Sequence, residues 1–119
     1  MRLLYVEDNE DIREAIAALL EADDRVILAC ATAEEALVVL ESQPVDVLIT
    51  DISLPGMSGM ELAKQALVRW PQLWVVFSSG YALDYGLSRL GPRVRSLAKP
   101  FDLDVMDKLL TEIQASLGW

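Results

Sequence analysis

The sequence predicts an α/β fold, a doubly wound parallel sheet of five strands with helices on both faces. Five short apolar runs, rich in branched residues, alternate with amphipathic stretches, which is typical of strands joined by helical crossovers. Four of the runs are continuously apolar, as expected of strands buried on both faces. The five runs are residues 3–6, 26–30, 45–50, 74–78 and 94–98.

Helix signals fill the segments between the first four runs. Asn9 precedes a stretch in which apolar residues recur at helical spacing. Thr32 and Ser58 are each followed three residues later by a glutamate, Glu35 and Glu61 respectively. Such a capping box satisfies the free amides of a first helical turn. The sequence therefore predicts one helix after each of the first three strands.

The last two predicted helices differ in the strength of their signals. A long amphipathic segment begins at Asp102, and Gly118 marks its end. Residues 82–90 give the weakest helix signal, because the segment is short, contains Gly86 and meets Gly91. A glycine inside a helix costs about 1 kcal/mol relative to alanine.

Length and composition indicate a single domain over residues 1–119. Hydrophobic residues make up 53% of the chain, and its single cysteine, Cys30, excludes a disulfide within the chain. We expect Cys30 to be a small buried hydrophobic residue. No apolar run reaches the length of a membrane span, and the first residues lack the layout of a signal peptide. We therefore expect a cytoplasmic domain without a membrane segment.

Charge excludes several classes of function. The chain has 19 acidic and 10 basic residues, a formal net charge of -9, which argues against direct binding of nucleic acid or anionic lipid. It has no histidine, so no reaction can use an imidazole as base, nucleophile or metal ligand. Any chemistry must come from carboxylates, hydroxyls, lysines or the single thiol.

Polar residues follow four of the predicted strands. Glu7 and Asp8 follow the first strand, Asp51 the third, Ser79 the fourth and Lys99 the fifth. Taken one at a time, they are explained as helix caps, turn residues or solvated charges. Those explanations do not account for their shared place at the carboxyl ends of the strands, where open α/β sheets bind ligands.

Three carboxylates gathered at one edge would repel each other unless a cation lies among them. Oxygen ligands without histidine or thiolate favour Mg²⁺, which readily accepts a phosphoryl oxygen as a further ligand. With Lys99 opposite, such a pocket could neutralise a phosphoryl group from two sides.

The motifs at these strand ends resemble those of a two-component response-regulator receiver domain. The resemblance extends over essentially the whole chain and rests on Glu7-Asp8, the run DISLPGMSG at residues 51–59, Ser79-Gly80 and Lys99-Pro100. It implies a five-stranded parallel sheet of flavodoxin-like order 2-1-3-4-5 with five helices. It also implies a phosphorylation-dependent switch in a histidine-to-aspartate phosphorelay. Such a domain is not an enzyme in the usual sense, although it assists its own phosphorylation and dephosphorylation.

The resemblance also assigns roles to residues. Asp51 would be the phosphoacceptor, with Ser79 and Lys99 as its catalytic partners. Mg²⁺ would be bound by Asp8 and Asp51 directly, by the backbone carbonyl of Ser53, and by Glu7 mainly through water. Because the chain has no histidine, the phosphodonor must be another protein or domain, a histidine kinase or histidine phosphotransfer protein. The downstream effector is open, and we expect a monomer or weak dimer.

The sequence departs from the family at the usual aromatic switch position. Ser96 stands three residues before Lys99, where the family has an aromatic residue. Either Tyr81 or Tyr85 transmits the signal instead, or the output is weak. The alternative function is a receiver-like interaction module that is not phosphorylated. The run 78–81 and the short fourth helix are similar to receivers of hybrid sensor kinases, so the chain is either a stand-alone regulator or such a receiver.

The chain just before and at the start of the fifth predicted strand is basic. It contains Arg89, Arg93 and Arg95 in an otherwise acidic chain. This segment is either a solvated edge or a partner surface beside the acidic residues at the start of the last helix.

Overall fold

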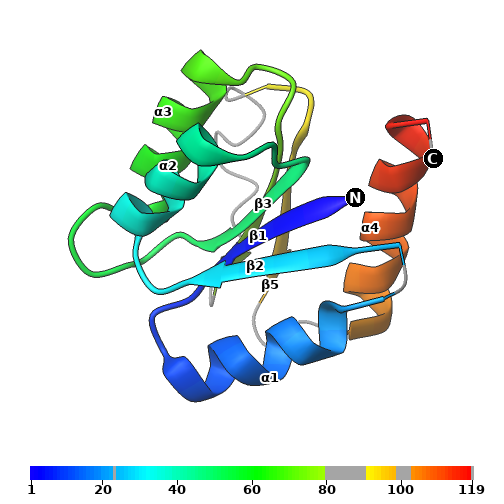
Figure 1. Cartoon of the computed structure of the whole chain (residues 1–119), viewed down its shortest axis with the longest axis horizontal. Helices are drawn as coiled ribbons and strands as arrows, with labels where there is room; N and C mark the ends of the chain where they lie inside the picture. The colour runs from blue at the N-terminus through cyan, green and yellow to red at the C-terminus, as the bar shows by residue number, and fades with distance from the viewer. Residues whose placement is uncertain (23, 80–90, 99–102, 119) are drawn as a thin grey trace.

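The structure, a computed structural model, describes residues 1–22, 24–79, 91–98 and 103–118. Its centre is a sheet of five parallel strands in the order β2-β1-β3-β4-β5 (Figure 1). The strands are β1 Arg2–Val6, β2 Val26–Cys30, β3 Val47–Asp51, β4 Trp74–Ser79 and β5 Val94–Ala98. The predicted fold class and strand order are confirmed.

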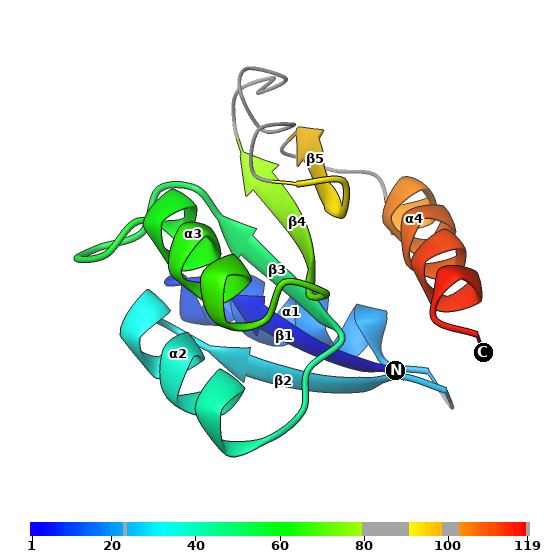
Figure 2. The same ribbon diagram turned by 90° about the horizontal axis from the view of Figure 1, so that it is seen from above.

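Four helices cover the sheet in the described ranges. They are α1 Glu10–Leu20, α2 Ala33–Ser42, α3 Gly59–Arg69 and α4 Leu103–Ser116. Helices α2 and α3 lie on one face, and α1 and α4 on the other (Figure 2). The fifth expected helix, at residues 82–90, lies outside the described residues.

Each face of the sheet buries its own apolar cluster. Leu4, Leu48 and Phe77 pack with α2 and α3. Tyr5 and Ile49 belong to the cluster beneath α1 and α4. Neighbouring residues of a strand point to opposite faces, so a strand between two helical layers must be apolar at nearly every position. This arrangement explains the continuous apolar runs.

Side-chain caps begin the first three helices as predicted. The amide of Glu35 donates to Thr32 Oγ1 over 3.1 Å, and the amide of Glu61 donates to Ser58 Oγ over 3.1 Å. Asn9 Oδ1 accepts from the amide of Ile12 over 3.0 Å at the start of α1. Each cap fixes the direction in which the chain leaves the loop that follows a strand.

The apolar stripe of α1 is less buried than its periodicity predicts. Ile12 is 44% exposed and Leu19 is 60% exposed, whereas Leu20 is buried. Helix α1 packs against β1 and the edge strand β2. Because β2 has no neighbouring strand on its outer side, part of the stripe has no sheet to cover it.

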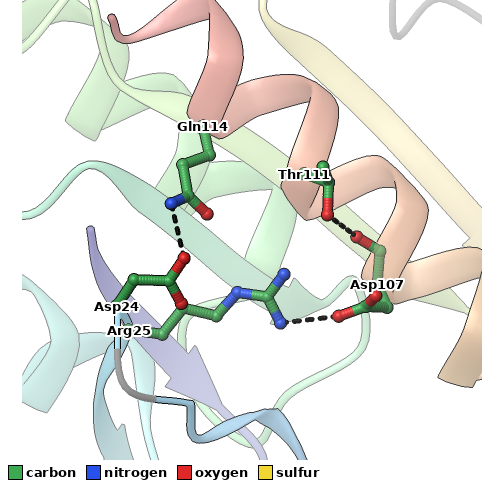
Figure 3. A network of polar contacts seen from close by, with 5 residues as sticks. All are labelled: Asp24, Arg25, Asp107, Thr111 and Gln114. Atoms are coloured by element: carbon green, nitrogen blue, oxygen red, sulfur yellow. Dashed lines mark hydrogen bonds and ion pairs between the residues drawn. The ribbon is translucent and has the colours of Figure 1, made fainter. Parts of the chain in front are cut away.

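A polar network holds α4 against the start of β2 (Figure 3). Arg25 Nη1 donates to Asp107 Oδ1 over 2.8 Å, and Gln114 Nε2 donates to Asp24 Oδ2 over 2.7 Å. The hydrogen bond from Gln114 keeps the pKa of Asp24 below its usual value. The ion pair of Arg25 with Asp107 thus joins two segments that lie far apart in the sequence.

Apolar residues occur on both the buried and the exposed sides of the described helices. None of them has both the length and the apolar character that a membrane span requires.

The burial of side chains predicts that truncation to alanine lowers the free energy of unfolding far more in the core than on the surface. Phe77 is fully buried, whereas Val68 is 83% exposed on α3. Phe77→Ala should lower the free energy of unfolding by about 3–5 kcal/mol, because it removes buried surface and leaves a cavity. Val68→Ala should change it by less than about 0.5 kcal/mol. Urea unfolding followed by circular dichroism measures both, and similar losses in the two variants would contradict this description of the core.

Candidate functional site

Three carboxylates lie together at the carboxyl edge of the sheet. Glu7, Asp8 and Asp51 each offer a ligand oxygen, and these oxygens all lie within 4.8 Å of one another. Glu7 is only 2% exposed, Asp51 is partly exposed and Asp8 is exposed. The cluster therefore has one buried member and an open side toward solvent.

The pairing of β1 with its neighbours places Glu7. Residue Val6 is in register with Thr50 of β3, so the residues after β1 meet the end of β3. The amide of Glu7 donates to the carbonyl of Cys30 over 3.1 Å, which extends the pairing with β2. Arg13 Nη1 donates to the carbonyl of Glu7 over 3.0 Å. The backbone of Glu7 is thus held from β2 and from α1.

Asp51 is the last residue of β3, and its side chain is held by the turn that follows. The amide of Ser53 donates to Asp51 Oδ1 over 3.2 Å. Farther along the same loop, the amide of Met57 donates to Glu34 Oε1 of α2 over 3.1 Å. These bonds fix the loop that carries Asp51 relative to the helical layer.

Gly59 allows α3 to begin directly against the carbonyl of Asp51. A Cβ atom at Gly59 would lie 1.8 Å from that carbonyl oxygen, far inside any real contact distance. The amide of Gly59 also donates to the carbonyl of Ile52 over 2.8 Å. Only a residue without a side chain permits this approach.

Tyr5 lies on the buried side of the site. Its pKa is raised well above the ordinary value, first by burial and then by the negative charges of Glu7 and Asp51. The phenol therefore stays neutral at physiological pH. It adds no further negative charge to the carboxylate cluster.

The donor set fits a hard divalent cation. All three members are carboxylates, and no thiol or imidazole is among them. Oxygen ligands of this kind suit Mg²⁺, which binds proteins through one or two carboxylates and keeps several waters. The exposed side at Asp8 leaves room for those waters.

Of the other predicted site residues, the structure describes Ser53, Ser79 and Ser96. Ser53 is exposed, and its amide is the donor to Asp51 noted above. Ser79 ends β4 and is in register with Ala98, the last residue of β5. Lys99 follows Ala98 and lies outside the described residues, as do Tyr81 and Tyr85. Ser96 is partly buried in β5, in register with Phe77.

Two residues of the site were not singled out from the sequence. Gly59 stands beside a capping serine, where a glycine is common for other reasons, so its close approach to Asp51 has no specific sequence signal. The bond from Arg13 to the carbonyl of Glu7 joins residues six positions apart through a flexible side chain. No periodicity or motif signals such a contact.

A doubly wound parallel sheet with a carboxylate cluster at its carboxyl edge defines an α/β domain with a candidate cation site at the edge where such sheets bind ligands. The comparisons with known proteins are more specific. The family model for the response regulator receiver domain matches residues 3–111. The chain belongs to this family. It is a phosphoacceptor module of two-component signalling rather than an enzyme in the usual sense.

Individual relatives agree with this assignment. The response regulator receiver protein CpdR of Brucella abortus is 32% identical over 118 residues, which cover 98% of this chain and 96% of CpdR. The receiver domain of the hybrid histidine kinase CckA is 32% identical with a TM-score of 0.81, covering 95% of this chain and 98% of that one. The response regulator TrrA of Thermotoga maritima, crystallised in complex with Mg²⁺-BeF, is 26% identical with a TM-score of 0.82, covering 94% of this chain and 97% of that one.

Several curated relatives are much longer than this chain. The hydrogenase transcriptional regulatory protein HoxA of Cupriavidus necator is 35% identical over 79 residues, which are 66% of this chain but 16% of HoxA. For the response regulator protein FleR of Pseudomonas aeruginosa, the matched part is 22% of its length. The chain thus spans about a fifth of these proteins.

Gly59→Ala should destabilise the protein although alanine is the better helix former. In an unconstrained helix the change would be neutral or would stabilise by up to about 1 kcal/mol. Here the new Cβ would collide with the carbonyl of Asp51, and we expect a loss of about 1–3 kcal/mol in the free energy of unfolding. The control is Lys64→Ala at an exposed position of the same helix, which should be nearly neutral. An unchanged or raised stability of Gly59→Ala would show that the close approach is not required.

Cys30 should react slowly with alkylating reagents in the folded protein. Burial raises the pKa of its thiol to about 12, with a smaller contribution from the charge of Glu35, so the reactive thiolate is scarce at neutral pH. Since the folded state keeps this proton longer than the unfolded state, the group also costs stability as pH rises from about 9 toward 12. Because Cys30 is the only cysteine, iodoacetamide labelling followed by mass spectrometry reports on it alone. Equal labelling rates with and without urea would contradict the buried position.

Proposed function

We propose that this chain is a phosphorylation switch in which Asp51 accepts a phosphoryl group from phosphohistidine. The observation that carries the proposal is the convergence of Glu7, Asp8 and Asp51 oxygens within 4.8 Å at the end of β3. Membership of the receiver family supports a signalling role for this cluster. Asp51 is the member of the cluster that ends a central strand, and its partial exposure leaves it open to a donor.

The proposed Mg²⁺ ligands are the carboxylates of Asp8 and Asp51 and the backbone carbonyl of Ser53, with Glu7 acting mainly through water. When bound, the ion would offset two of the three negative charges of the cluster and bind one oxygen of the incoming phosphoryl group. The relative TrrA was crystallised with Mg²⁺-BeF, which supports a magnesium site in this chain. The hydrogen bond from the amide of Ser53 keeps one oxygen of Asp51 directed toward its own turn.

In the proposed reaction, a carboxylate oxygen of Asp51 attacks phosphorus. A P–O bond to Asp51 forms while the P–N bond to the donor histidine breaks, and the electron pair of that bond stays on the imidazole nitrogen. Charge in the transition state is spread over three phosphoryl oxygens, so positioning and electrostatics supply most of the catalysis. The donor ring carries a proton on its other nitrogen, so the products are an aspartyl phosphate on this chain and a neutral imidazole on the donor.

Ser79 and Lys99 are the proposed catalytic partners of Asp51. The backbones of β4 and β5 support this assignment, because Ser79 is in register with Ala98, directly before Lys99. The Ser79 hydroxyl would donate to one phosphoryl oxygen, and the Lys99 ammonium would pair with another as a point charge.

The remaining parts of the proposal concern the setting of the switch. The donor is a histidine kinase or a histidine phosphotransfer protein, and residues 1–119 form one receiver domain in the cytoplasm. Receiver-family membership supports each of these points. Since Ser96 stands at the usual aromatic position, either Tyr81 or Tyr85 transmits the phosphorylation signal or the output is weak.

Acetyl phosphate tests the acceptor directly. With Mg²⁺ present, the intact protein should gain the mass of one phosphoryl group, and Asp51→Asn should gain none, because an amide is not a nucleophile for this step. Chelation of Mg²⁺ with EDTA should slow the gain in the wild type. Mass spectrometry of the intact chain at short times after mixing measures each rate.

Glu112→Gln is the matched control. It removes a carboxylate from an exposed position of α4 and should leave the mass gain unchanged. Phosphorylation that persists in Asp51→Asn would move the acceptor to another residue. Failure of the wild-type protein to gain mass would favour the alternative, an interaction module that is not phosphorylated.

A further inference from the structure

Ser78 carries a buried hydroxyl in β4 that the function described so far does not use. The residue is only 1% exposed, and its Oγ finds no hydrogen-bond partner in the part of the chain that the structure describes. A buried hydroxyl normally has a partner, because it gives up its hydrogen bonds to water when the chain folds. An unpaired hydroxyl in the core therefore needs an explanation.

The pairing of β3 with β4 places this hydroxyl beside Asp51. Ser78 is the Cα partner of Asp51 in the register of the two strands. Neighbouring strands lie about 4.8 Å apart, and side chains alternate between the two faces of a sheet. Ile49 and Val76, two positions earlier in each strand, both belong to the cluster beneath α1 and α4. Asp51 and Ser78 therefore lie side by side and point to this same face.

Asp51 has a different kind of neighbour on each side. Val6 is in register with Thr50, so the next residues, Glu7 and Asp51, face each other across β1 and β3. Glu7 is a carboxylate and repels a negative group at Asp51. Ser78, on the other side, has a proton to donate. Of these two lateral neighbours, only Ser78 is able to bind added negative oxygens.

Ser78 and Ser79 approach the end of β3 from different faces. Because the two serines are consecutive in β4, their side chains point to opposite faces of the sheet. Ser79 points to the same face as Phe77, which belongs to the cluster beneath α2 and α3. Strand β4 thus offers Asp51 one hydroxyl on each face, and Ser78 does not duplicate the role proposed for Ser79.

We infer that Ser78 Oγ donates a hydrogen bond to the aspartyl phosphate at Asp51 and lacks this bond in the unphosphorylated protein. The inference rests on the proposed function of Asp51. Phosphorylation extends the Asp51 side chain by a phosphorus atom and three oxygens, which bring new acceptors toward a hydroxyl that the carboxylate leaves unbonded. Hydrogen bonds to charged oxygens are stronger than those between neutral groups. A bond made in only one of two states shifts the equilibrium toward that state, here the phosphorylated one.

Beryllofluoride with Mg²⁺ tests the inference at equilibrium, since its tetrahedral beryllium and fluorines stand in for the phosphoryl group on Asp51. The relative TrrA was crystallised with Mg²⁺-BeF. Ser78→Ala removes the hydroxyl with little change in size. Without ligands, the variant should unfold at a urea concentration no lower than that of the wild type, because no hydrogen bond is lost. It should bind beryllofluoride about three- to tenfold more weakly, as measured by urea unfolding over a series of ligand concentrations.

Ser42→Ala is the matched control, because it removes a hydroxyl from an exposed position at the end of α2 and should leave the affinity for beryllofluoride unchanged. The inference alone is overturned if the wild-type protein binds beryllofluoride and Ser78→Ala binds it equally well, or if Ser42→Ala weakens binding as much. A lower stability of ligand-free Ser78→Ala would also overturn it, since the hydroxyl would then already be bonded. A wild-type protein that neither binds beryllofluoride nor gains mass from acetyl phosphate would instead overturn the proposed function, and the inference with it.

Discussion

Electrostatic repulsion among three carboxylates is the constraint on which the rest of this molecule depends. Two unit charges 4.8 Å apart repel by roughly 3 kcal/mol at an effective dielectric constant of about 20. With Glu7 buried, water can do little to weaken this repulsion from the inner side. A divalent cation converts the same geometry into an attraction, and so the site has a built-in affinity for a metal and for the negative group that the metal attracts.

The fold must supply the force that keeps these charges together. Backbone pairing does so at Glu7, whose amide and carbonyl are bound by β2 and by Arg13. At Asp51 the amide of Ser53 holds the side chain, and the backbone at Gly59 lies directly against the carbonyl. The hydrophobic layers on both faces stabilise the five strands, and each strand end then inherits a fixed position. The packing of the hydrophobic layers, which lie away from the site, is therefore a condition for the chemistry at the carboxyl edge of the sheet.

Much of this arrangement can be predicted from local sequence. The apolar runs predict the ends of the strands to within two residues. They do so because a strand covered on both faces must be apolar at nearly every position. Thr32 and Ser58 identify their helix starts, since few other residue patterns satisfy the free amides of a first turn. Once the order of the sheet is known, the meeting of Glu7, Asp8 and Asp51 follows from their places after β1 and β3.

Other features depend on contacts between distant residues and had no local signal. Arg25 binds Asp107 across 82 positions of sequence. The exposure of Leu19 follows from the edge position of β2, which periodicity within α1 cannot reveal. The clash that excludes a side chain at Gly59 requires the path of the backbone around Asp51.

The carboxylate cluster is buried at Glu7 and exposed at Asp8, so it has one closed side and one open side. A group that enters or leaves the cluster passes on the side of Asp8. Exchange with solvent at this edge of the sheet is therefore one-sided, because the strands packed behind Glu7 close the other approach.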